Sequence, residues 1–255
     1  MTSQGKVVFV TGASAGFGEA IARRFAADGA RVVATARRSG RIEALARELG
    51  PGVLPLTLDV QDRTAVADAV AALPAEFAGI DVLVNNAGLA KGLEPAYEAD
   101  LDAWDQMIDT NCKGLTYCTR AILPGMVARG RGHVINLGSI AGTYPYPGGN
   151  VYGATKAFVH QFSLDLRSDL HGTGVRVTCI EPGLSGGTEF SVVRFGGDRA
   201  RAGAVYEGVQ PLDAGDVAEA VHWAASLPPH VNINTIEMMP VAQSFGPLPV
   251  ARGEA

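Results

Sequence analysis

Two residues in the segment NVYGATKAFV have the types and the spacing needed for proton transfer. Tyr152 and Lys156 are four residues apart, which places both side chains on one face of a helix. A phenol with the ordinary pKa of about 10 is a poor base at neutral pH. A nearby ammonium group stabilises the phenolate and lowers that pKa. The pair therefore predicts a tyrosine that exchanges a proton with a substrate oxygen.

Ser139 is a second candidate catalytic residue. It follows the predicted strand HVINL, so its hydroxyl can hydrogen-bond a reacting oxygen at the end of that strand. A serine that only forms a turn is the alternative. No GxSxG motif surrounds it, which excludes the usual serine hydrolase arrangement. We predict no metal site, because the histidines show no ligand spacing: His133, His160, His171, His222 and His230.

A glycine-rich turn near the N-terminus predicts a nucleotide site. The segment VVFVTGASAGFGEAIARRFAADG reads as a strand, a turn containing Gly12, Gly16 and Gly18, and a helix. Glycines let the backbone approach a pyrophosphate, and the helix N-terminus offers free N–H groups and the positive end of its dipole. An ordinary tight turn between strand and helix is the alternative.

The end of the next predicted strand, TARR, indicates which nucleotide binds. An acidic residue there would accept hydrogen bonds from the ribose 2′-hydroxyl of NAD, and this segment has none. Arg37 and Arg38 can instead donate charge-assisted hydrogen bonds to the 2′-phosphate of NADP. We therefore predict NADP(H) as the cofactor. The alternative is that both arginines only cover the start of a helix.

The elements that must position these residues alternate along the chain. Seven short apolar runs are predicted strands: KVVFV, RVVAT, VLPLTL, DVLVN, HVINL, VRVTCI and INTIEMM. Helical patterns separate them, including segments 17–28, 101–120 and 151–170, and Ser39 and Asp62 are predicted N-caps. This alternation predicts an α/β fold with a parallel sheet and helices on both faces. Ligands of such sheets bind at the carboxyl ends of the strands.

Composition sets broad limits on the protein. Its 255 residues are 47% hydrophobic and 18% charged, with a net charge of -5. These values predict one globular domain over 1–255 with a core at about 5–245, and they argue against nucleic-acid and membrane partners. The N-terminus resembles neither a signal peptide nor a membrane span, so we expect a cytoplasmic location. Cys112, Cys118 and Cys179 fit buried thiols in a reducing compartment.

Taken together, TGxxxGxG, NNAG at 85–88, Ser139 and YxxxK resemble the short-chain dehydrogenase/reductase family. The resemblance implies a Rossmann-type, doubly wound sheet, a homotetramer, and hydride transfer with the catalytic set Ser139, Tyr152, Lys156 and Asn111. Asn111 would support a water-mediated proton relay to the lysine. The positive nicotinamide of the oxidised cofactor would further lower the pKa of Tyr152. The implied cofactor-binding residues are Gly12, Ala13, Ser14, Ala15, Gly16, Phe17, Gly18, Arg37, Arg38, Asp59, Val60, Asn86, Ala87, Gly88, Tyr152, Lys156, Pro182, Gly183 and Thr188.

Longer segments are similar to one branch of that family, the bacterial NADP-dependent 3-hydroxy acid dehydrogenases. They include GFGEAIARRF, MIDTNCKGL and HVNINTIEMMPV. The resemblance implies oxidation of small 3-hydroxy acids, such as serine, L-allo-threonine and 3-hydroxypropionate, or reduction of the 3-oxo acid or semialdehyde. A related branch reduces sulfoacetaldehyde. The partner is then a small anionic substrate.

The segment PGLSGGTEFSVVRFGG, residues 182–197, is predicted to be a lid over the reacting groups. We predict substrate contacts from Ser139, Tyr152, Gly187 and Arg194, with Arg194 binding the substrate anion. A solvated surface arginine is the alternative, and Lys91 is a second candidate anchor. The segment TYPYPGG is expected to form the opposite wall of the pocket, or else a packed structural loop.

Two other functions remain open from the sequence. A reductase of 3-oxoacyl groups on a carrier protein would need a long groove and a basic docking patch, and Arg129 and Arg131 form only a small one. A non-catalytic NADPH-binding sensor would have no need for the serine, tyrosine, lysine and asparagine together.

Overall fold

The computed structural model describes residues 3–246 and contains one seven-stranded sheet. The strands lie in the order β3-β2-β1-β4-β5-β6-β7, and every neighbouring pair is parallel. They are β1 (Val7–Thr11), β2 (Arg31–Ala36), β3 (Val53–Thr57), β4 (Val82–Asn85), β5 (Gly132–Leu137), β6 (Val175–Pro182) and β7 (Thr235–Met238). The order turns back beside β1, so the predicted doubly wound, Rossmann-type fold is confirmed.

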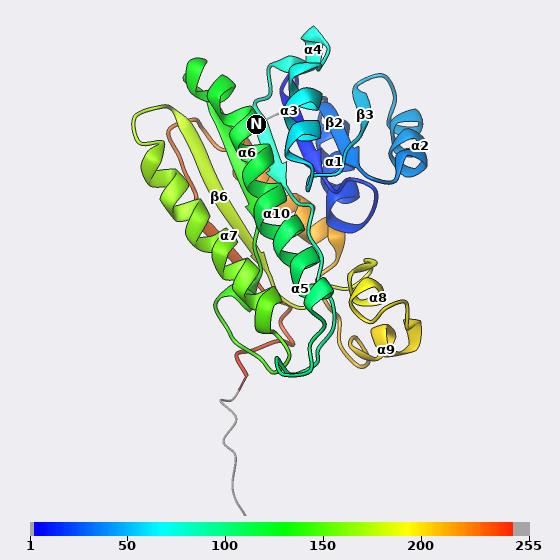
Figure 1. The fold of residues 1–255 in the computed structure, drawn as a ribbon. Helices are drawn as coiled ribbons and strands as arrows, with labels where there is room; N and C mark the ends of the chain where they lie inside the picture. Colours follow the sequence, from blue (N-terminus) through cyan, green and yellow to red (C-terminus); the bar gives the residue numbers. More distant parts are fainter. Residues whose placement is uncertain (1–2, 247–255) are drawn as a thin grey trace, which may run out of the picture.

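Helices cover both faces of this sheet (Figure 1). One face carries α1 (Gly16–Ala27), α2 (Ser39–Leu49) and α10 (Ala214–Ser226), packed through Phe25, Leu45 and Val221. The other carries α3 (Arg63–Ala71), α6 (Leu115–Ala128) and α7 (Asn150–Asp169). Shorter helices are α4 (Ala75–Ala78), α5 (Leu101–Ile108), α8 (Phe190–Arg194) and α9 (Arg199–Ala204).

Buried apolar strands explain why the sheet is the centre of the molecule. All five residues of β1 and all four of β4 are buried, as expected for central strands covered on both sides. The edge strand β7 is only half-buried. None of the helices described within 3–246 is both long and apolar enough to cross a membrane.

The helix boundaries differ from the sequence prediction in two places. Asp62 caps α3 as predicted, because its side chain accepts from the backbone N–H groups of Thr64 and Ala65. Ser39 is instead the first residue of α2, whose N-cap is Arg38. The predicted helix 101–120 is divided by a π-helical segment, Asp109–Gly114. The sequence analysis also missed α4, α8, α9 and α10.

The carboxyl ends of the strands meet at one edge of the sheet, and the lobe of α8 and α9 lies beside that edge (Figure 1). The glycine-rich turn follows β1, the two arginines follow β2, and NNAG follows β4. Ser139 follows β5, and the predicted lid follows β6. A parallel arrangement therefore gathers motifs that are far apart in the sequence.

Candidate active site

A single cleft of about 830 Å³ lies at this edge and contains most of the predicted site residues. Its walls include the glycine-rich turn, Arg37 and Arg38 at one end, and Ser139, Tyr152 and Lys156 at the other. The lid residues Thr188 and Arg194 also line it. The volume lies in the upper part of the range for small-molecule and cofactor pockets.

The glycine-rich turn has the backbone that its sequence predicts. Gly12 has a φ of 69°, a left-handed conformation that is unfavourable for residues with a side chain. At Gly18 a Cβ would collide with the carbonyl oxygen of Gly12, so the helix packs tightly on the turn. Ala15, the N-cap of α1, makes no side-chain cap bond to the first N–H groups of the helix, and Ala15, Gly16 and Phe17 line the cleft.

Thr11, which the sequence analysis did not single out, joins this turn to the NNAG segment. Its hydroxyl accepts hydrogen bonds of 2.9 Å from the backbone N–H groups of Asn86 and Ala87. The side-chain amide of Asn86 donates to the carbonyl of Thr11 at 2.8 Å. The two segments that line the middle of the cleft are therefore held together at the ends of β1 and β4. The sequence signal that could have identified Thr11 is its position directly before Gly12, the first glycine of the turn.

Ser139 lies at the start of a short 3₁₀ turn, Ile140–Gly142, directly after β5. Its hydroxyl accepts from the N–H of Ala141 at 3.1 Å and donates to the carbonyl of Pro182 at 3.4 Å. Ser139 therefore does form a turn, the role that the sequence analysis gave as the alternative to catalysis. Because it lines the cleft beside Tyr152, the turn and the predicted catalytic position are compatible.

Tyr152 and Lys156 lie on one face of α7, as predicted, and both are buried. The Lys156 ammonium is 5.9 Å from the centroid of the Tyr152 ring and donates to the carbonyl of Leu137 at 2.7 Å. Burial raises the pKa of Tyr152 to about 12, partly offset by Ser139 and Arg194. The protein's own groups thus shift this pKa upward, because desolvation outweighs the nearby positive charge.

Burial also lowers the pKa of Lys156 to about 8. Three groups around the ammonium act in the opposite direction: Cys179, Cys112 and Glu181. Desolvation of a cation is again the largest effect. Tyr152 and Lys156 therefore both favour their neutral forms more strongly than they would in water.

Asn111 lies in the π-helical segment between α5 and α6 rather than in a regular helix. Its side chain accepts from the N–H of Leu89 and donates to the carbonyl of Leu89, both at 2.9 Å, and donates to the hydroxyl of Thr155 at 3.0 Å. A Cβ on Gly88 would lie 3.3 Å from Asn111 Oδ1 and 3.7 Å from Lys156 Nζ. The asparagine is thus near the lysine without lining the cleft itself. Single-turn π-bulges occur frequently at functional sites.

The other end of the cleft is rich in exposed charge. Arg38 donates to the hydroxyl of Ser14 through Nε at 3.1 Å and Nη2 at 2.9 Å. Its Nη1 forms an ion pair with Glu189, which also pairs with Arg41. The two guanidinium groups hold the pKa of Glu189 below its ordinary value. The arginines therefore line the cleft and do more than cover the start of α2.

Arg194 lies inside the cleft, at the reacting end. Its Nε donates to the carbonyl of Gly92 at 3.1 Å and its Nη2 donates to the hydroxyl of Tyr146 at 2.7 Å. The guanidinium carbon is 5.6 Å from the centroid of the Tyr152 ring. A freely solvated arginine, the alternative interpretation, does not describe this side chain. Lys91 does not line the cleft.

Tyr146 belongs to the TYPYPGG segment, which was expected to be a pocket wall. Tyr144, Pro145, Tyr146 and Pro147 all line the cleft, and Tyr146 contacts Arg194 of the lid. The ring of Tyr144 packs against Phe245, with centroids 4.7 Å apart. Gln243, also near the C-terminal end of the described chain, accepts from the N–H of Leu184 at 2.7 Å. The wall is therefore supported by a segment that the sequence analysis had not connected with the site.

Three predicted contact residues do not line the cleft. Ala13 is fully buried in the core, and its N–H donates to the carbonyl of Thr35. Gly18 faces the turn and allows its close packing. Gly187 is exposed, with open space where a side chain would point, so its position does not support the predicted substrate contact. The other predicted cofactor residues, including Asp59, Val60, Pro182 and Gly183, do line the cleft.

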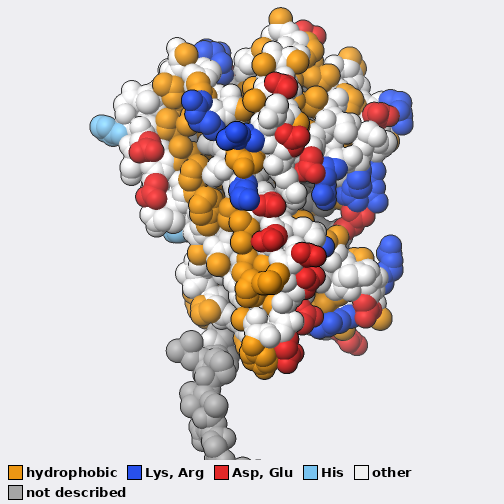
Figure 2. All heavy atoms as spheres, viewed as in Figure 1, with side chains coloured by type: hydrophobic (Ala, Val, Ile, Leu, Met, Phe, Trp, Pro, Cys, Tyr) orange, Lys and Arg blue, Asp and Glu red, His pale blue; other side chains and the backbone are white. Residues whose placement is uncertain are grey.

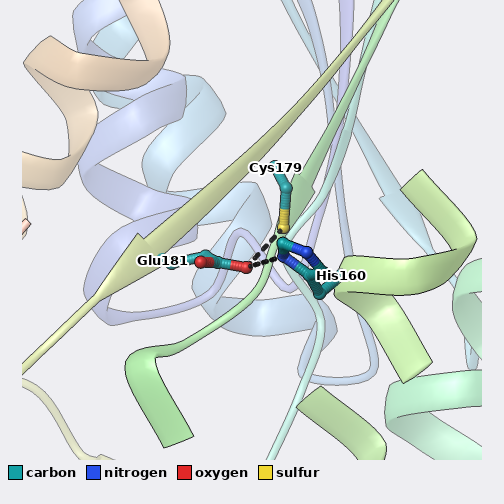
Figure 3. A group of neighbouring side chains, drawn as sticks. All are labelled: His160, Cys179 and Glu181. Atoms are coloured by element: carbon teal, nitrogen blue, oxygen red, sulfur yellow. Dashed lines mark hydrogen bonds and ion pairs between the residues drawn. The ribbon is translucent and has the colours of Figure 1, made fainter. Parts of the chain in front are cut away.

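A cluster behind the catalytic end contains groups of the metal-ligand type, although no ligand spacing was apparent in the sequence. His160, Cys179 and Glu181 meet where α7 packs on β6 (Figure 3). One oxygen of the buried Glu181 lies 2.6 Å from His160 Nδ1 and accepts from Cys179 Sγ at 3.5 Å. The cluster is thus hydrogen-bonded internally, and Glu181 is one of the groups that partly offset the lowering of the Lys156 pKa by burial.

A dinucleotide-type turn in one cleft with a half-buried serine and a buried tyrosine and lysine defines an oxidoreductase site of the Rossmann type. The chain matches the short chain dehydrogenase family over residues 6–194. The protein belongs to this family, and the resemblance inferred from its motifs is confirmed.

Individual relatives are similar over nearly the whole chain. The NADP-dependent 3-hydroxy acid dehydrogenase YdfG of Salmonella typhi is 64% identical over 246 residues, which cover 96% of this chain and 99% of that protein. The serine 3-dehydrogenase of Agrobacterium fabrum is 52% identical over 96% of this chain and 98% of its own length. A solved structure described as the closed form of serine dehydrogenase complexed with NADP+ is 60% identical. It superposes with a TM-score of 0.96 and covers 97% of this chain and 100% of its own.

Proposed function

We propose that the protein is an NADP(H)-dependent dehydrogenase that interconverts a small 3-hydroxy acid and its 3-oxo acid or semialdehyde. Serine, allo-threonine and 3-hydroxypropionate represent the substrate type. The observation that carries this proposal is the position of Arg194, whose guanidinium lies in the cleft 5.6 Å from the Tyr152 ring. A fixed cation beside a proton-transfer group suits a substrate with a carboxylate a few atoms from its hydroxyl. The names of the relatives agree with this substrate class.

The residues of the cleft fit NADP(H). The glycine-rich turn and the start of α1 would hold the pyrophosphate, with Asp59 and Val60 beside the adenine and Asn86–Gly88 along the cofactor. Arg37 and Arg38 would bind the 2′-phosphate, since no carboxylate follows β2 to favour a free 2′-hydroxyl. Pro182, Gly183 and Thr188 would contact the nicotinamide side. When bound, the cofactor supplies the acceptor or donor of the hydride.

The chain's own residues would carry the proton. In the direction of reduction, Tyr152 donates its phenolic proton to the substrate oxygen, and its raised pKa keeps that proton in place until the oxygen becomes basic. Ser139 would turn its hydroxyl from the carbonyl of Pro182 to donate a hydrogen bond to the same oxygen and orient it. Lys156 stabilises the phenolate that remains. Asn111 is hydrogen-bonded to Leu89 and Thr155. From this position it would support a water-mediated relay that returns a proton to Lys156.

Arg194 would be the anchor for the substrate anion. Its Nη1 group is not engaged by any hydrogen bond within the described chain, while Nε and Nη2 fix the orientation of the guanidinium. A carboxylate can therefore bind without first releasing these contacts. A sulfonate offers similar oxygens, so hydroxysulfonates belong in the same substrate screen.

The experiment is a panel of small hydroxy acids and hydroxysulfonates assayed with NADP and with NAD. We expect the highest kcat/KM for a 3-hydroxy acid with NADP. Preference for a hydroxysulfonate would assign the protein to the sulfoacetaldehyde branch. Preference for an acyl thioester would assign it to the carrier-protein reductases, of which one solved member is 29% identical to this chain. Tight NADPH binding without any turnover would support the sensor.

We also propose that the protein is a homotetramer located in the cytoplasm. Exposed apolar side chains support pairing through the helices, among them Ile108 on α5 and Phe158 on α7. The three cysteines are unpaired thiols, as expected in a reducing compartment. Size-exclusion chromatography with light scattering gives the mass of the assembly directly. A mass of one or two chains would contradict the tetramer. Fractionation of cells that express the protein tests its location.

A further inference from the structure

Glu189 links the lid to the opposite side of the cleft. It directly precedes α8, and both oxygens of its carboxylate are engaged. Oε2 accepts from Arg38 Nη1 at 2.6 Å, and Oε1 accepts from Arg41 Nη1 at 2.9 Å. These arginines are more than 140 residues away in the sequence and flank the start of α2. A carboxylate held by two guanidinium groups at once defines a specific contact between the lid and this helix.

The link continues to the glycine-rich turn. Arg38 also donates through Nε and Nη2 to the hydroxyl of Ser14. The residue before Glu189 in the lid, Thr188, lies against Gly16 of the same turn, where a Cβ would be 3.2 Å from the Cβ of Thr188. The turn, Arg38 and the lid therefore form a continuous bridge across the arginine end of the cleft. In Figure 2, charged side chains of both signs lie at the surface beside the lobe that contains α8 and α9.

We propose that Glu189 is a positioning residue that latches the lid over the 2′-phosphate end of the bound cofactor and slows its release. The proposal rests on the proposed binding of NADP(H). The structure that superposes with a TM-score of 0.96 is described as closed and complexed with NADP+, which supports a lid conformation compatible with a bound cofactor.

The charges at this end agree with a carboxylate and a phosphate that bind together. Arg37, Arg38 and Arg41 carry three positive charges, and Glu189 neutralises one of them. A phosphate monoester carries close to two negative charges at neutral pH. The phosphate and Glu189 together would therefore balance the three arginines, and a cofactor without the phosphate would leave them in excess.

The exposure of the latch limits the size of the effect. The side chains of Arg38, Arg41 and Glu189 are 46%, 51% and 43% exposed, and exposed ion pairs are individually weak. A weak latch opens readily, as an exchangeable cofactor requires. We expect its removal to change the dissociation rate of NADPH by about 3- to 10-fold rather than by orders of magnitude.

The direction of the change separates this proposal from simple electrostatics. If the Glu189 carboxylate only lay near the 2′-phosphate, it would repel the phosphate. Removing the carboxylate would then slow the release of NADPH. A latch acts in the opposite direction, because its removal frees the lid. Arg41 provides an independent variant, since it pairs with Glu189 but does not line the cleft. Its own charge also attracts the phosphate through space, and the double variant separates that attraction from an effect through Glu189.

The test is stopped-flow displacement of NADPH from the full-length protein, followed by its fluorescence in the absence of substrate. Glu189→Gln and Arg41→Gln should each release NADPH faster, and the double variant should be no faster than Glu189→Gln alone. Glu207→Gln is the matched control: it removes the same charge from an exposed residue that has no ion pair among residues 3–246. It should leave the rate unchanged, and unchanged unfolding midpoints would show that all variants fold.

The outcomes separate the latch from the proposed function. A wild-type protein that does not bind NADPH would contradict the proposed function and the latch together. Wild-type binding followed by equal or slower release from Glu189→Gln would overturn the latch alone. The proposal would also be overturned if the double variant released NADPH faster than Glu189→Gln by the full effect of Arg41→Gln. Arg41 would then act independently of Glu189.

Discussion

The two ends of the cleft use charge in different ways. At the arginine end, Arg38, Arg41 and Glu189 are partly exposed and form a network of ion pairs. At the reacting end, Tyr152 and Lys156 are buried, and desolvation shifts the pKa of Tyr152 to about 12 and that of Lys156 to about 8. Exposed charges attract and select an anion at little cost in stability. Burial favours the neutral form of both groups, because it penalises the charged form.

The difference implies a division of labour within one cleft. In the proposed function, the arginine end would select the cofactor that binds, and the reacting end would set the rate of the chemical step. Arg194 belongs to the second group by position, since it lies beside Tyr152. Substitutions at the two ends should therefore affect different measured quantities, and their effects should differ greatly in size.

The largest expected effect is at Tyr152. Tyr152→Phe removes the phenolic proton while leaving the ring that packs against Phe190. We expect kcat to fall by about 10²- to 10⁴-fold, the usual contribution of acid–base catalysis. Steady-state assays with NADPH measure this loss, and NADPH fluorescence should show unchanged affinity. A hydride-transfer rate equal to that of the wild type would exclude Tyr152 as the proton donor.

The next largest effect is expected at Arg194. Arg194→Ala should lower kcat/KM for a 3-hydroxy acid by about 10- to 100-fold, which corresponds to the loss of charge-assisted hydrogen bonds. The uncharged methyl ester of the same acid should lose much less. Arg199→Ala, which removes an exposed arginine from the same lobe, serves as the control. Equal losses on acid and ester would mean that Arg194 acts only through Gly92 and Tyr146.

How much of this site follows from the sequence depends on the separation of its parts. Tyr152 and Lys156 are four residues apart, so helical geometry alone places them together. The glycine turn is equally local. The contacts of Glu189 with Arg38 and of Arg194 with Gly92 each join segments more than 100 residues apart, and no local pattern specifies such pairs. The π-helical turn at Asn111 and the cluster of His160, Cys179 and Glu181 likewise depend on tertiary packing.

The sign of the pKa shift at Tyr152 also could not be read from the sequence. The sequence indicates which cation lies nearby but not how deeply the phenol is buried. In the folded protein, burial is the first cause of the shift, ahead of Ser139 and Arg194. Catalysis by this tyrosine therefore depends on what binds beside it as well as on Lys156.

A smaller effect is expected at the arginine end. Arg38→Gln should raise KM for NADP by about 10-fold, the loss expected for one charge-assisted hydrogen bond, and leave KM for NAD nearly unchanged. Initial rates with both cofactors give the ratio. An equal rise in KM for NAD would show that Arg38 supports the glycine-rich turn through Ser14 instead of binding the phosphate.

The smallest effect is expected from salt. Raising the ionic strength from about 0.05 M to 0.5 M shortens the Debye length and should raise KM for NADP by a few fold. The rate of hydride transfer should stay within about 2-fold, because buried groups are screened much less. Single-turnover rates at both ionic strengths make the comparison. An equal response of KM and hydride transfer would show that the two ends are not electrostatically distinct.

The division of labour is tested most directly by measuring two quantities for the same two variants. NADPH affinity and the single-turnover rate of hydride transfer at saturating cofactor would be compared for Arg38→Gln and Tyr152→Phe. We predict that Arg38→Gln weakens NADPH binding and keeps the hydride-transfer rate, whereas Tyr152→Phe keeps the affinity and loses the rate. A variant that changes both quantities to a similar extent would contradict the separation of cofactor selection from chemistry.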